Sequence, residues 1–570
     1  MSVFFNGRKI TTPATASKVN DDAMRNQNLS VGNVVALLGV AAGGKPKTAL
    51  RYGSPQQAQA ELVSGELLDA VLKAFDPSSE TGGPDLVLAY RVNPATPATL
   101  ALNNSVPAAV INLTSTGYGL RENQTKVKIE AGSTVGQRVT VARGDATYVG
   151  DNLARNLLSI VYGGAQATAT VTLTGSTVVL AAPAGTTVAT IDLNSYTTVQ
   201  ALVDRINAVA SFTAVALDGN ASMPTLNALD YVTAQSVKTI SNITGNLQAV
   251  VDWFNSNAEP LVTATRVAAQ GTVPANLAYT YLAGATEGTP VTQDWTDAFT
   301  ELQKADVQWI TPVTSDPAIH AMTDTHCKFM TDTARKERRA ICGMALGTTD
   351  AQAIAAAKLL NSDRASLVHI GHYDYDASGA LVLYAPYQSA ARISGGFAGV
   401  NPGTPLTNKN FKCRGLEREL RIPTDTDPLI DGGVLCIGNT DQGYKVIKSI
   451  STWIQNANYN KVEQSCGVAV DFTIRNVREA LDVLRGQKGT PILLSRAVSI
   501  AESTLRELAK PEPVGPGVLV GDADSPAYRN ITATLVGDVV QVQYEASPVI
   551  PANYILVTMF AVPFTGTATA

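Results

Sequence analysis

The chain has 570 residues, enough for several modules with sizeable cores, and charged residues make up only 16% of it. Its 43 lysine and arginine residues stand against 48 acidic residues, and the net charge of −5 gives no general attraction to nucleic acid or to an acidic membrane surface. No apolar stretch approaches the roughly 20 residues that a membrane span needs, and the five cysteines are scattered without a CxxC pair, so we expect no membrane insertion, disulfide framework or zinc site.

The first elements of the chain are an arm and the beginning of an α/β pattern. Residues 1–30 show no helical or strand period long enough to build a core, and we predict an extended arm. The α/β pattern covers residues 31–104. There a buried strand, NVVALLGV (33–40), leads through a glycine turn to a helix over 54–75 and then to a second strand, DLVLAYRV (85–92).

The glycine turn resembles the phosphate-binding loop of nucleotide hydrolases. In GVAAGGKPKT (39–48), Gly39, Gly44 and Lys45 have the spacing of that loop. The loop also needs a serine or threonine directly after the lysine to hold Mg²⁺, whereas Pro46 offers neither a hydroxyl nor an N–H group. We therefore interpret these glycines as a turn and expect no nucleotide cofactor.

Residues 105–285 are rich in Thr, Val, Ala and Gly and contain short alternating segments such as KVKIEA and TATVTLTG, which are typical of β-strands separated by turns. One helix, TTVQALVDRINAVA (197–210), lies among them, with Thr197 as its expected cap. The sequence therefore predicts a β-rich domain inserted into an α/β domain. Because its ends near Asn104 and Ala285 fall in turn-rich sequence, we expect the insert to be dispensable for folding of the core.

The α/β pattern resumes over residues 286–404. Strands are expected at VQWITPV (307–313), AICGMALG (340–347) and SLVHIGHY (366–373). They alternate with helices, one of which is expected from Pro317 to about Arg339. This alternation predicts a mostly parallel sheet with helices on its faces, to which the 31–104 stretch also belongs.

The last part of the chain is expected to form an α+β module over 405–510 and a mostly extended segment over 511–570. QVQYEA (541–546) alternates polar and apolar residues, as a strand with one wet face does, and YILVTMF (554–560) is apolar on nearly both faces, which suits a strand buried in a sheet. A strand at a chain end needs partners, because an unpaired edge exposes backbone groups.

The histidines show no pattern that supports metal binding or catalysis. His320 and His326 fall on different faces of a predicted helix, so this helix alone does not present them to one metal ion. His369 and His372 flank a glycine at the end of a predicted strand, where α/β sheets bind ligands, but no candidate nucleophile or third ligand is near in the sequence.

Two further polar clusters have simple interpretations. Asp374 and Asp376 resemble the start of a Ca²⁺ loop that lacks its glutamate, and we interpret them as a turn. The basic run ARKERRA (334–340) is interpreted as the solvated end of a helix, where cations are favoured. We therefore expect no catalytic, cofactor-binding or metal site.

A second basic set, formed by Arg475, Arg478, Arg485 and Lys488, lies along or just beyond the predicted helix IRNVREALDVLRGQK. Spacings of three and seven place the three arginines near one face of that helix, beside the opposite apolar stripe. A solvent-exposed helix face and a charged docking face both fit this pattern.

The order of several segments resembles that of the contractile tail sheath proteins of bacteriophages. The resemblance rests on LLGVAAGGKPKTALRYGSPQQAQAELVSGELLDAVLKAF, LAGATEGTPVTQDWTDAFTELQKADVQWITPV, YAPYQSAARISGGFAG, LIDGGVLCI, LRGQKGTP and VQYEASPVIPANYILVTMF. It covers about two-thirds of the chain and leaves out the 105–285 insert.

This resemblance implies a structural subunit that is not an enzyme and that needs no cofactor. Such subunits form stacked hexameric rings around a tail tube and contract to drive the tube through the host envelope. The expected partners are the chain itself, the tube protein, and baseplate and terminator or neck proteins, in a virion tail assembled in the host cytoplasm. R-type bacteriocin sheaths and type VI secretion sheaths share this core, and an α/β enzyme with a β-rich lid is the alternative from another class.

The resemblance also assigns roles to particular residues. The C-terminal module would lie nearest the tube, which makes Arg475, Arg478, Arg485 and Lys488 the candidates to contact it, and inserted domains would project outward. Both chain ends would be exchanged with neighbouring subunits by strand addition. The expected arm-strand residues are Val3, Phe4, Phe5, Ile10, Val542, Tyr544, Tyr554, Ile555, Leu556, Val557 and Met559.

Overall fold

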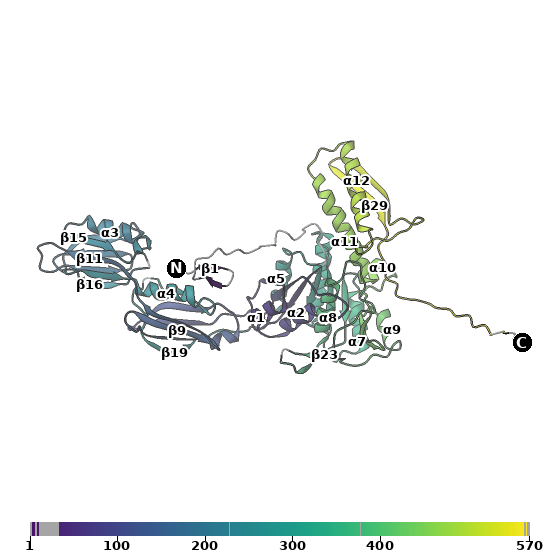
Figure 1. Cartoon of the computed structure of the whole chain (residues 1–570), viewed down its shortest axis with the longest axis horizontal. Coiled ribbons are helices and arrows are strands. Elements are labelled where there is room, and N and C mark those ends of the chain that lie inside the picture. The colour runs from purple at the N-terminus through teal and green to yellow at the C-terminus, as the bar shows by residue number, and fades with distance from the viewer. Residues whose placement is uncertain are drawn as a thin grey trace. The chain divides into compact units, whose positions relative to one another are not determined.

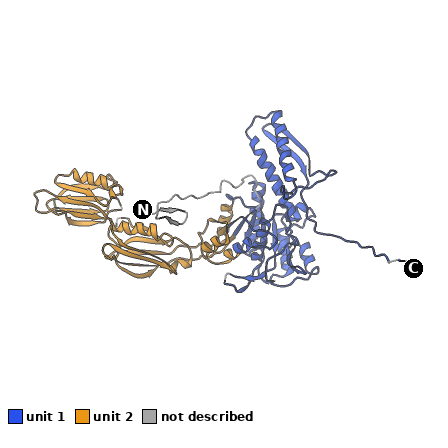
Figure 2. Cartoon of the chain, viewed as in Figure 1, with its two compact units in different colours: residues 1–37, 70–88, 303–570 blue, residues 38–69, 89–302 orange. Residues whose placement is uncertain are grey.

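The computed structural model describes residues 33–226, 228–268, 270–376, 378–563 and 566, together with the backbone of residues 3–5 and 8–10. The chain divides into two compact units, which Figure 2 shows in different colours. Unit 1 comprises residues 1–37, 70–88 and 303–570, and unit 2 comprises residues 38–69 and 89–302.

The largest sheet of the described chain has six strands in the order β22-β21-β20-β3-β5-β4. Their bounds are Ala365–Val368, Arg339–Gly343, Trp309–Pro312, Val34–Gly39, Leu86–Arg91 and Ala49–Tyr52. The pairs β20–β21 and β21–β22 are parallel, and all three of these strands are buried along their length. Continuous apolar strands form such a sheet because both of its faces are covered. The predicted parallel α/β sheet is confirmed for these strands.

Three helices of unit 1 come after the first of these parallel strands in the sequence: α6 (Pro317–Asp332), α7 (Asp350–Leu360) and α8 (Pro386–Ala398). Helices α7 and α8 are labelled in Figure 1. Helix α6 begins where the carboxylate of Asp316 accepts the Ala318 N–H at 2.8 Å. It ends earlier than predicted, because Arg339 already begins a strand. Helix α8 is buried from end to end, and a Cβ on Gly395 would lie 2.0 Å from the Ala74 carbonyl oxygen. Only glycine allows this approach.

The single helix predicted over 54–75 is wrong, because the structure has two: α1 (Pro55–Leu62) and α2 (Glu66–Phe75). The break comes at Val63 and Gly65, whose φ angles are +66° and +108°. A side chain at Gly65 would also press on the Ala41 backbone, 3.1 Å away. The apolar stripe of the sequence continues across this break, so the periodicity gave no sign of it.

Unit 2 contains two separate β-rich cores where the sequence predicted one inserted domain. The outer core holds the sheets β18-β7-β6 and β10-β9-β8-β19 with helix α4. These elements are β6 (Thr99–Asn103), β7 (Ala109–Ser115), β8 (Lys126–Ala131), β9 (Gln137–Arg143), β10 (Ala146–Leu153), α4 (Asn246–Asn257), β18 (Val262–Arg266) and β19 (Leu277–Tyr281).

The inner core is inserted in the sequence between β10 and α4 of the outer core. It holds the sheets β15-β11-β17 and β14-β13-β12-β16 with helix α3. These elements are β11 (Asn156–Tyr162), β12 (Thr170–Thr174), β13 (Thr177–Ala181), β14 (Thr187–Asp192), α3 (Val199–Asn207), β15 (Phe212–Ala216), β16 (Val232–Ser236) and β17 (Ser241–Thr244). Helix α3 is capped by Thr198 and not by Thr197. Helix α4 was not predicted, because its mixture of valine and aromatic residues also fits a strand.

The two ends of the β-rich region lie side by side within unit 2. The hydroxyl groups of Thr96 and Thr286 are 2.9 Å apart, and the backbones of Thr99 and Ala283 form a bridge. The hairpin of β6 and β7 spans the predicted boundary at residue 105, so the structural boundary falls closer to Pro97. At this base the fully buried guanidinium of Arg91 donates to the Glu287 carboxylate at 2.5 Å.

Removal of residues 98–284 should leave a folded core. We expect a variant that joins Pro97 to Ala285 through a short Gly/Ser linker to be soluble and to melt cooperatively, since the Thr96–Thr286 contact already holds the two ends together. Circular dichroism and gel filtration would measure this. Insoluble expression of the variant, while the matched deletion of residues 156–244 stays soluble, would show that the outer β-rich core is required by the rest of the chain.

Helix α5 (Thr292–Leu302) completes unit 2. The remaining elements of unit 1 before the C-terminal module are β23 (His372–Tyr375), β24 (Leu381–Tyr384), β25 (Gly415–Leu416), α9 (Thr426–Asp431), β26 (Cys436–Thr440), β27 (Gly443–Lys448) and α10 (Tyr459–Val462). The strand predicted over 366–373 is therefore two strands, since β22 ends at Val368 and β23 begins at His372.

At the N-terminus, β1 (Val3–Phe5) pairs antiparallel with β2 (Arg8–Ile10), and Val3 lies opposite Ile10. The two extended segments expected in the N-terminal arm are thus strands that pair with each other. The rest of that arm, residues 11–30, lies outside the described residues.

Candidate assembly site

In the structure, the C-terminal module comprises residues 464–546 and combines two long helices and a hairpin. Helix α11 (Gln464–Leu481) packs beside α12 (Pro491–Leu508), and β28 (Tyr528–Val536) pairs antiparallel with β29 (Val539–Ala546). Helix α12 begins at a threonine cap, where the Thr490 hydroxyl accepts the Leu493 N–H. Gly537, with φ +61°, allows the tight turn between the strands. These four elements share one small apolar core.

Beside strand β29 the module has an open groove of about 840 Å³. Helix α11 contributes Ile474, Val477 and Leu481, helix α12 contributes Leu493 and Ala497, and the hairpin contributes Leu535, Val540, Val542 and Tyr544. Most of this lining is apolar, with Arg478, Asp482, Arg485 and Asp538 also present. An apolar groove of this kind exposes surface that a partner could cover.

The hairpin that borders the groove offers strand edges for pairing. Within the described residues, β28 and β29 form a sheet of two strands only. The predicted alternation in 541–546 is confirmed: Gln541, Gln543 and Glu545 are exposed, whereas Val542 and Tyr544 are partly buried. An edge strand with one apolar face is a template for another strand.

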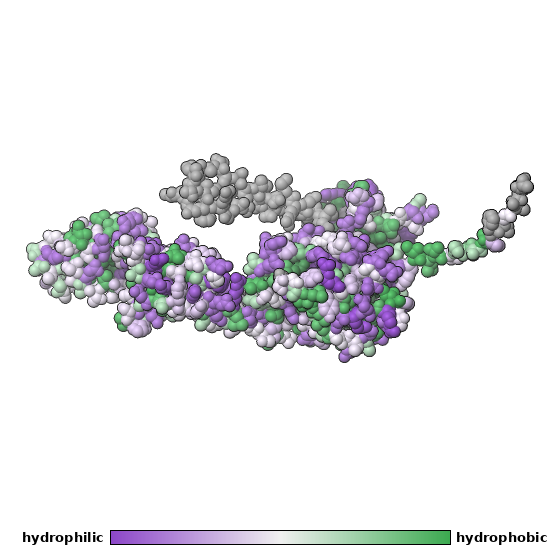
Figure 3. Space-filling view, turned by 60° about the horizontal axis from the view of Figure 1, so that its bottom comes forward, coloured by the Kyte–Doolittle hydropathy of each residue, from purple (hydrophilic) through white to green (hydrophobic). Residues whose placement is uncertain are grey.

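The C-terminal segment, residues 547–563, leaves the module as a single extended chain (Figure 1). The predicted strand over 554–560 is not present in the isolated chain. Its side chains are instead solvent-exposed, from 75% for Tyr554 to 94% for Leu556. Figure 3 shows the described part of this segment mostly in the colour of hydrophobic residues. Within the described residues, no other segment pairs with residues 554–560, and they are not part of a strand.

The root of this segment is nevertheless anchored. The Val549 N–H donates to the Val518 carbonyl at 2.9 Å, and the Val520 N–H donates to the Ser547 carbonyl at 3.0 Å. Further along, the Asn553 amide donates to the buried Glu463 carboxylate at 2.7 Å. The segment is therefore fixed to the module up to Asn553 and exposed beyond it.

The predicted arginine face does not exist as one surface. Arg475 has a side chain that is 8% exposed, and it pairs with Asp306 and Glu479. Hydrogen bonds and charge from these two carboxylates raise the pKa of Arg475, although burial acts in the opposite direction. Arg478 donates to both oxygens of Glu337, at 2.7 and 2.8 Å. Both residues are thus committed to contacts within the subunit.

Arg485 and Lys488 remain accessible from the predicted set. The Arg485 side chain is 80% exposed and pairs with the exposed Asp482 at 2.9 Å, and Lys488 is also exposed. They lie beyond the end of α11, in the loop before α12. The structure therefore separates the four predicted residues into two that pair with carboxylates distant in the chain, Arg475 (buried) and Arg478 (29% exposed), and two that are exposed.

Arg475 and Arg478 belong to a joint. It lies between helix α11 and the N-terminal ends of the parallel strands β20, β21 and β22. Asp471 of α11 accepts from Arg339 at 2.9 Å and from Arg364 at 2.6 Å, and both arginines are largely buried. Gln464 accepts a further hydrogen bond from Arg339 at 2.8 Å. Burial lowers the pKa of Arg339, and the charge of Asp471 opposes this.

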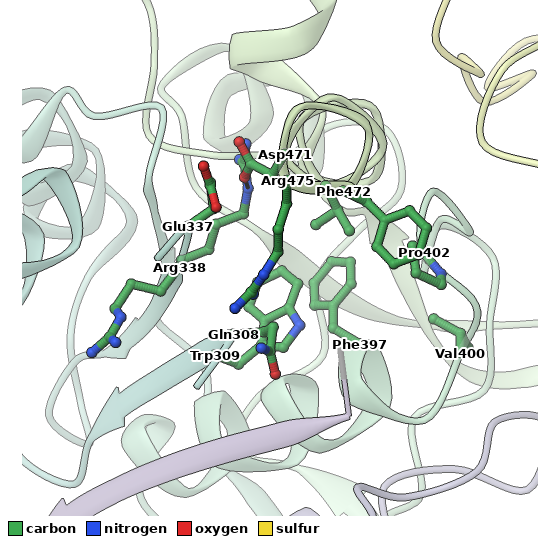
Figure 4. A pocket seen from close by; sticks show the side chains of 12 residues that line it. Gln308, Trp309, Glu337, Arg338, Phe397, Val400, Pro402, Asp471, Phe472 and Arg475 are labelled. Atoms are coloured by element: carbon green, nitrogen blue, oxygen red, sulfur yellow. Dashed lines mark hydrogen bonds and ion pairs between the residues drawn. The ribbon is translucent and has the colours of Figure 1, made fainter. Parts of the chain in front are cut away.

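A small hollow of about 40 Å³ lies within this joint and is drawn in Figure 4. Trp309 and Phe397 stack there with ring centres 4.4 Å apart, and Phe472 of α11 faces them. Arg475 reaches across from α11 toward the strand that carries Trp309 (Figure 4). The joint thus combines aromatic packing with ion pairs and fixes the C-terminal module to the sheet.

The joint was missed by the sequence analysis, and its basic half was misassigned. In the run 334–340, Arg338 and Arg339 are buried, so the interpretation as a solvated helix end is wrong. The available signal was that this basic pair stands at the start of the buried strand β21, whose first residue is Arg339. Asp471 gave a second signal, because it stands alone as an acid between apolar residues of a helix.

The histidines have structural partners in unit 1. The His320 ring lies 2.9 Å from the Thr314 carbonyl, His369 lies 3.1 Å from Asp350, and His372 lies 2.8 Å from the Ser389 hydroxyl. Burial, together with the charge of Arg338, lowers the pKa of His326 to about 3, which keeps that ring neutral. No group of three His, Cys, Asp or Glu residues in the described ranges could hold a metal ion.

The remaining sequence motifs are structural. Asp376 accepts the N–H groups of Ser378 and Ala380, which confirms the predicted turn, and Asp374 pairs with Lys73 and Arg392. None of the helices in the described part of the chain has the length and apolar character that a membrane span needs.

The chain is similar to curated phage proteins along its whole length. It is 29% identical over 587 residues to the tail sheath protein of Bacillus phage SP01, an alignment that covers 99% of this chain and 98% of that protein. It is 28% identical over 504 residues to the putative tail sheath protein of Enterococcus phage phiEF24C, covering 84% of this chain and 85% of that protein. No family model matches the chain.

Two solved structures share the fold. The sheath tail protein from Listeria innocua aligns with a TM-score of 0.54 at 13% identity, covering 93% of this chain and 97% of that one. The sheath tail protein from Desulfitobacterium hafniense aligns with a TM-score of 0.51 at 13% identity, covering 95% and 100%. The mixed α/β multi-domain architecture is therefore one that solved sheath tail proteins also have.

Proposed function

We propose that this chain, a homologue of phage tail sheath proteins, is the structural subunit of a contractile phage tail sheath. The observation that carries the proposal is sequence similarity over 99% of the chain, which includes the β-rich region as well as the core. The proposal extends to stacked hexameric rings around a tail tube and to contraction that drives the tube through the host envelope. The phage origin of the curated relatives favours this assignment over a bacteriocin or type VI secretion sheath.

The partners proposed for the subunit are further copies of itself, the tube protein, the baseplate, and the terminator or neck proteins. Its proposed location is the virion tail, after assembly in the host cytoplasm. Negative-stain electron microscopy of the purified full-length chain tests the central claim, because a sheath subunit should form rings or tubes. A monodisperse monomer over a wide range of concentrations, with and without tube protein, would contradict it.

The contacts between subunits are proposed to use the exposed C-terminal segment. The segment 554–560 of one subunit would lie in the groove beside β29 of a neighbour and add a strand to the β28–β29 hairpin. Three features support this: the segment is apolar and exposed, the groove is apolar and open, and β29 has a similar length of eight residues. Main-chain hydrogen bonds would give affinity, and the apolar lining would receive alternate side chains.

The N-terminal arm is proposed to make a second link of the same kind. In the described chain, Val3, Phe4, Phe5 and Ile10 belong to the small hairpin β1–β2. That hairpin could add its strands to a neighbouring sheet as a unit, because a two-stranded hairpin alone is marginal in water. Links through extended arms would let rings move past each other while they stay connected.

Arg485 and Lys488 are the proposed contacts with an acidic tube surface. Reversal of both charges, Arg485→Glu with Lys488→Glu, should weaken assembly on tubes and leave the melting temperature unchanged, since both side chains are exposed. Single exposed pairs contribute under about 1 kcal/mol, but a polymer repeats them many times. Co-sedimentation with tubes measures the effect. The charge swap Glu502→Lys with Arg506→Glu, at an exposed ion pair of α12, serves as a control for altered surface charges that leave the net charge unchanged. Unchanged binding would place this loop on the solvent side.

A further inference from the structure

The C-terminal segment is held at its root by one side-chain pair. Asn553 Nδ2 donates to Glu463 Oε1 at 2.7 Å. Glu463 is 2% exposed and precedes the first residue of α11, so it joins the segment to the start of the helix that carries the joint and the groove.

Each member of this pair has one side-chain oxygen that makes no hydrogen bond within the described residues. Among the described residues, neither Glu463 Oε2 nor Asn553 Oδ1 has a hydrogen-bond partner, and both atoms are buried. A carboxylate oxygen and an amide oxygen are both acceptors, so they cannot bond to each other. A protonated carboxyl group changes this, because its O–H can donate to the amide oxygen while its other oxygen accepts from the amide nitrogen. The pair as observed has one hydrogen bond and two buried acceptor oxygens without a donor, and a proton on Glu463 would supply a donor.

Few titratable groups of the described chain lie near Glu463. Lys448 at the end of β27 lies 4.0 Å from its carboxylate and is itself bound by Tyr554, whose hydroxyl is 3.3 Å from the lysine nitrogen. Cys466 of α11 is the other titratable group that faces it. Burial raises the pKa of Glu463, while Lys448 and the Asn553 hydrogen bond act in the opposite direction.

We propose that Glu463 and Asn553 form a proton-dependent latch on the root of the C-terminal segment. With the proton bound, two hydrogen bonds hold Asn553 against α11. Without it, one bond remains and a buried carboxylate oxygen has no donor, so the root opens more often. The latch itself does not depend on the proposed function. Only its consequence, the release of the segment toward a neighbouring subunit, rests on that function.

The direction of the pH effect follows from the raised pKa of Glu463 in the folded chain. A group whose pKa is raised by folding binds its proton more tightly in the closed root than in the open one. Its contribution to closing is therefore complete below the ordinary pKa of glutamate and is lost as the pH rises through the folded-state pKa. Acid should tighten the root, and neutral or alkaline pH should loosen it.

Hydrogen exchange of the root amides in the full-length chain tests the latch. The Glu463→Gln variant keeps both hydrogen bonds at every pH, because its amide nitrogen replaces the protonated oxygen. We expect the exchange of residues 549–556 to be equal in wild type and Glu463→Gln at about pH 4.5, and several-fold faster in wild type at pH 8. Comparison at the same pH removes the intrinsic pH dependence of exchange. If the ratio of the wild-type exchange rate to the Glu463→Gln exchange rate is the same at pH 4.5 and at pH 8, the latch is overturned.

The Asn553→Ala variant gives a second, independent measurement, because it removes the amide while its backbone lies in an exposed segment. At every pH it should exchange faster than Glu463→Gln does at that same pH, and this rate ratio should already be reached at pH 4.5 and stay the same at pH 8. Exchange in Asn553→Ala that is as slow as in Glu463→Gln at pH 4.5 would also overturn the proposal. These measurements use unassembled subunits, so the latch can stand if tubes do not form, and it can fail while tubes form normally.

Discussion

A chain truncated after Asn553 should fold as the full-length chain does and form no tubes. The truncation removes the exposed residues Tyr554–Phe560 but leaves the root contacts of Val549 and Asn553 in place. Each large apolar side chain of the segment would contribute about 1.5–3 kcal/mol when buried in a neighbour, so loss of five or more should abolish assembly outright. Circular dichroism would report the unchanged fold, and electron microscopy would report the absence of tubes.

A groove variant should show the same defect from the other side. Val540→Glu places a charge in the apolar groove, whereas Gln541→Glu places the same charge on the exposed face of β29 and should assemble normally. Neither the truncated chain nor Val540→Glu should polymerise alone. Mixed together, they should form a one-to-one complex, because one supplies an open groove and the other an intact segment. Normal tubes from the truncated chain, or no complex in the mixture, would rule out exchange through this groove.

Asp471→Asn should be the most destabilising single substitution at the joint. It leaves the guanidinium groups of Arg339 and Arg364 buried without their shared carboxylate. Removal of one partner from a buried ion pair costs on the order of 3–5 kcal/mol, because the remaining charge stays out of water. Urea unfolding followed by circular dichroism should therefore show an earlier transition for Asp471→Asn than for wild type.

The matched control for this substitution is Glu502→Gln, which breaks the exposed pair of Glu502 with Arg506 on α12. Exposed pairs contribute little to stability, so its unfolding transition should coincide with that of wild type. Equal unfolding of Asp471→Asn and Glu502→Gln would show that α11 is held to the sheet by the packing of Phe472 and Trp309 rather than by the ion pairs.

The sequence by itself determined the elements whose signal is local. Continuous apolar runs predicted β3 and β20–β22, and the alternation in 541–546 predicted β29 with its exposed face. The stretch between β3 and β4 forms turns, as the glycines predicted, and the absence of a nucleotide, expected from Pro46, stays a prediction. Segment order supported the sheath resemblance, which the whole-length similarity to phage tail sheath proteins confirms.

Only the tertiary structure decided how residues far apart in the sequence are used. Periodicity alone placed Arg475, Arg478, Arg485 and Lys488 together, but carboxylates distant in the chain, at Asp306 and Glu337, bind the first two and leave the last two exposed. The sequence also did not reveal that one β-rich core is inserted into the other. Strands such as β7 and β18 pair with each other although the whole inner core lies between them in the sequence. Local patterns report which face of an element is apolar. They do not report which distant element covers that face. For residues 554–560 of the C-terminal segment, no element of the described chain covers the apolar side chains.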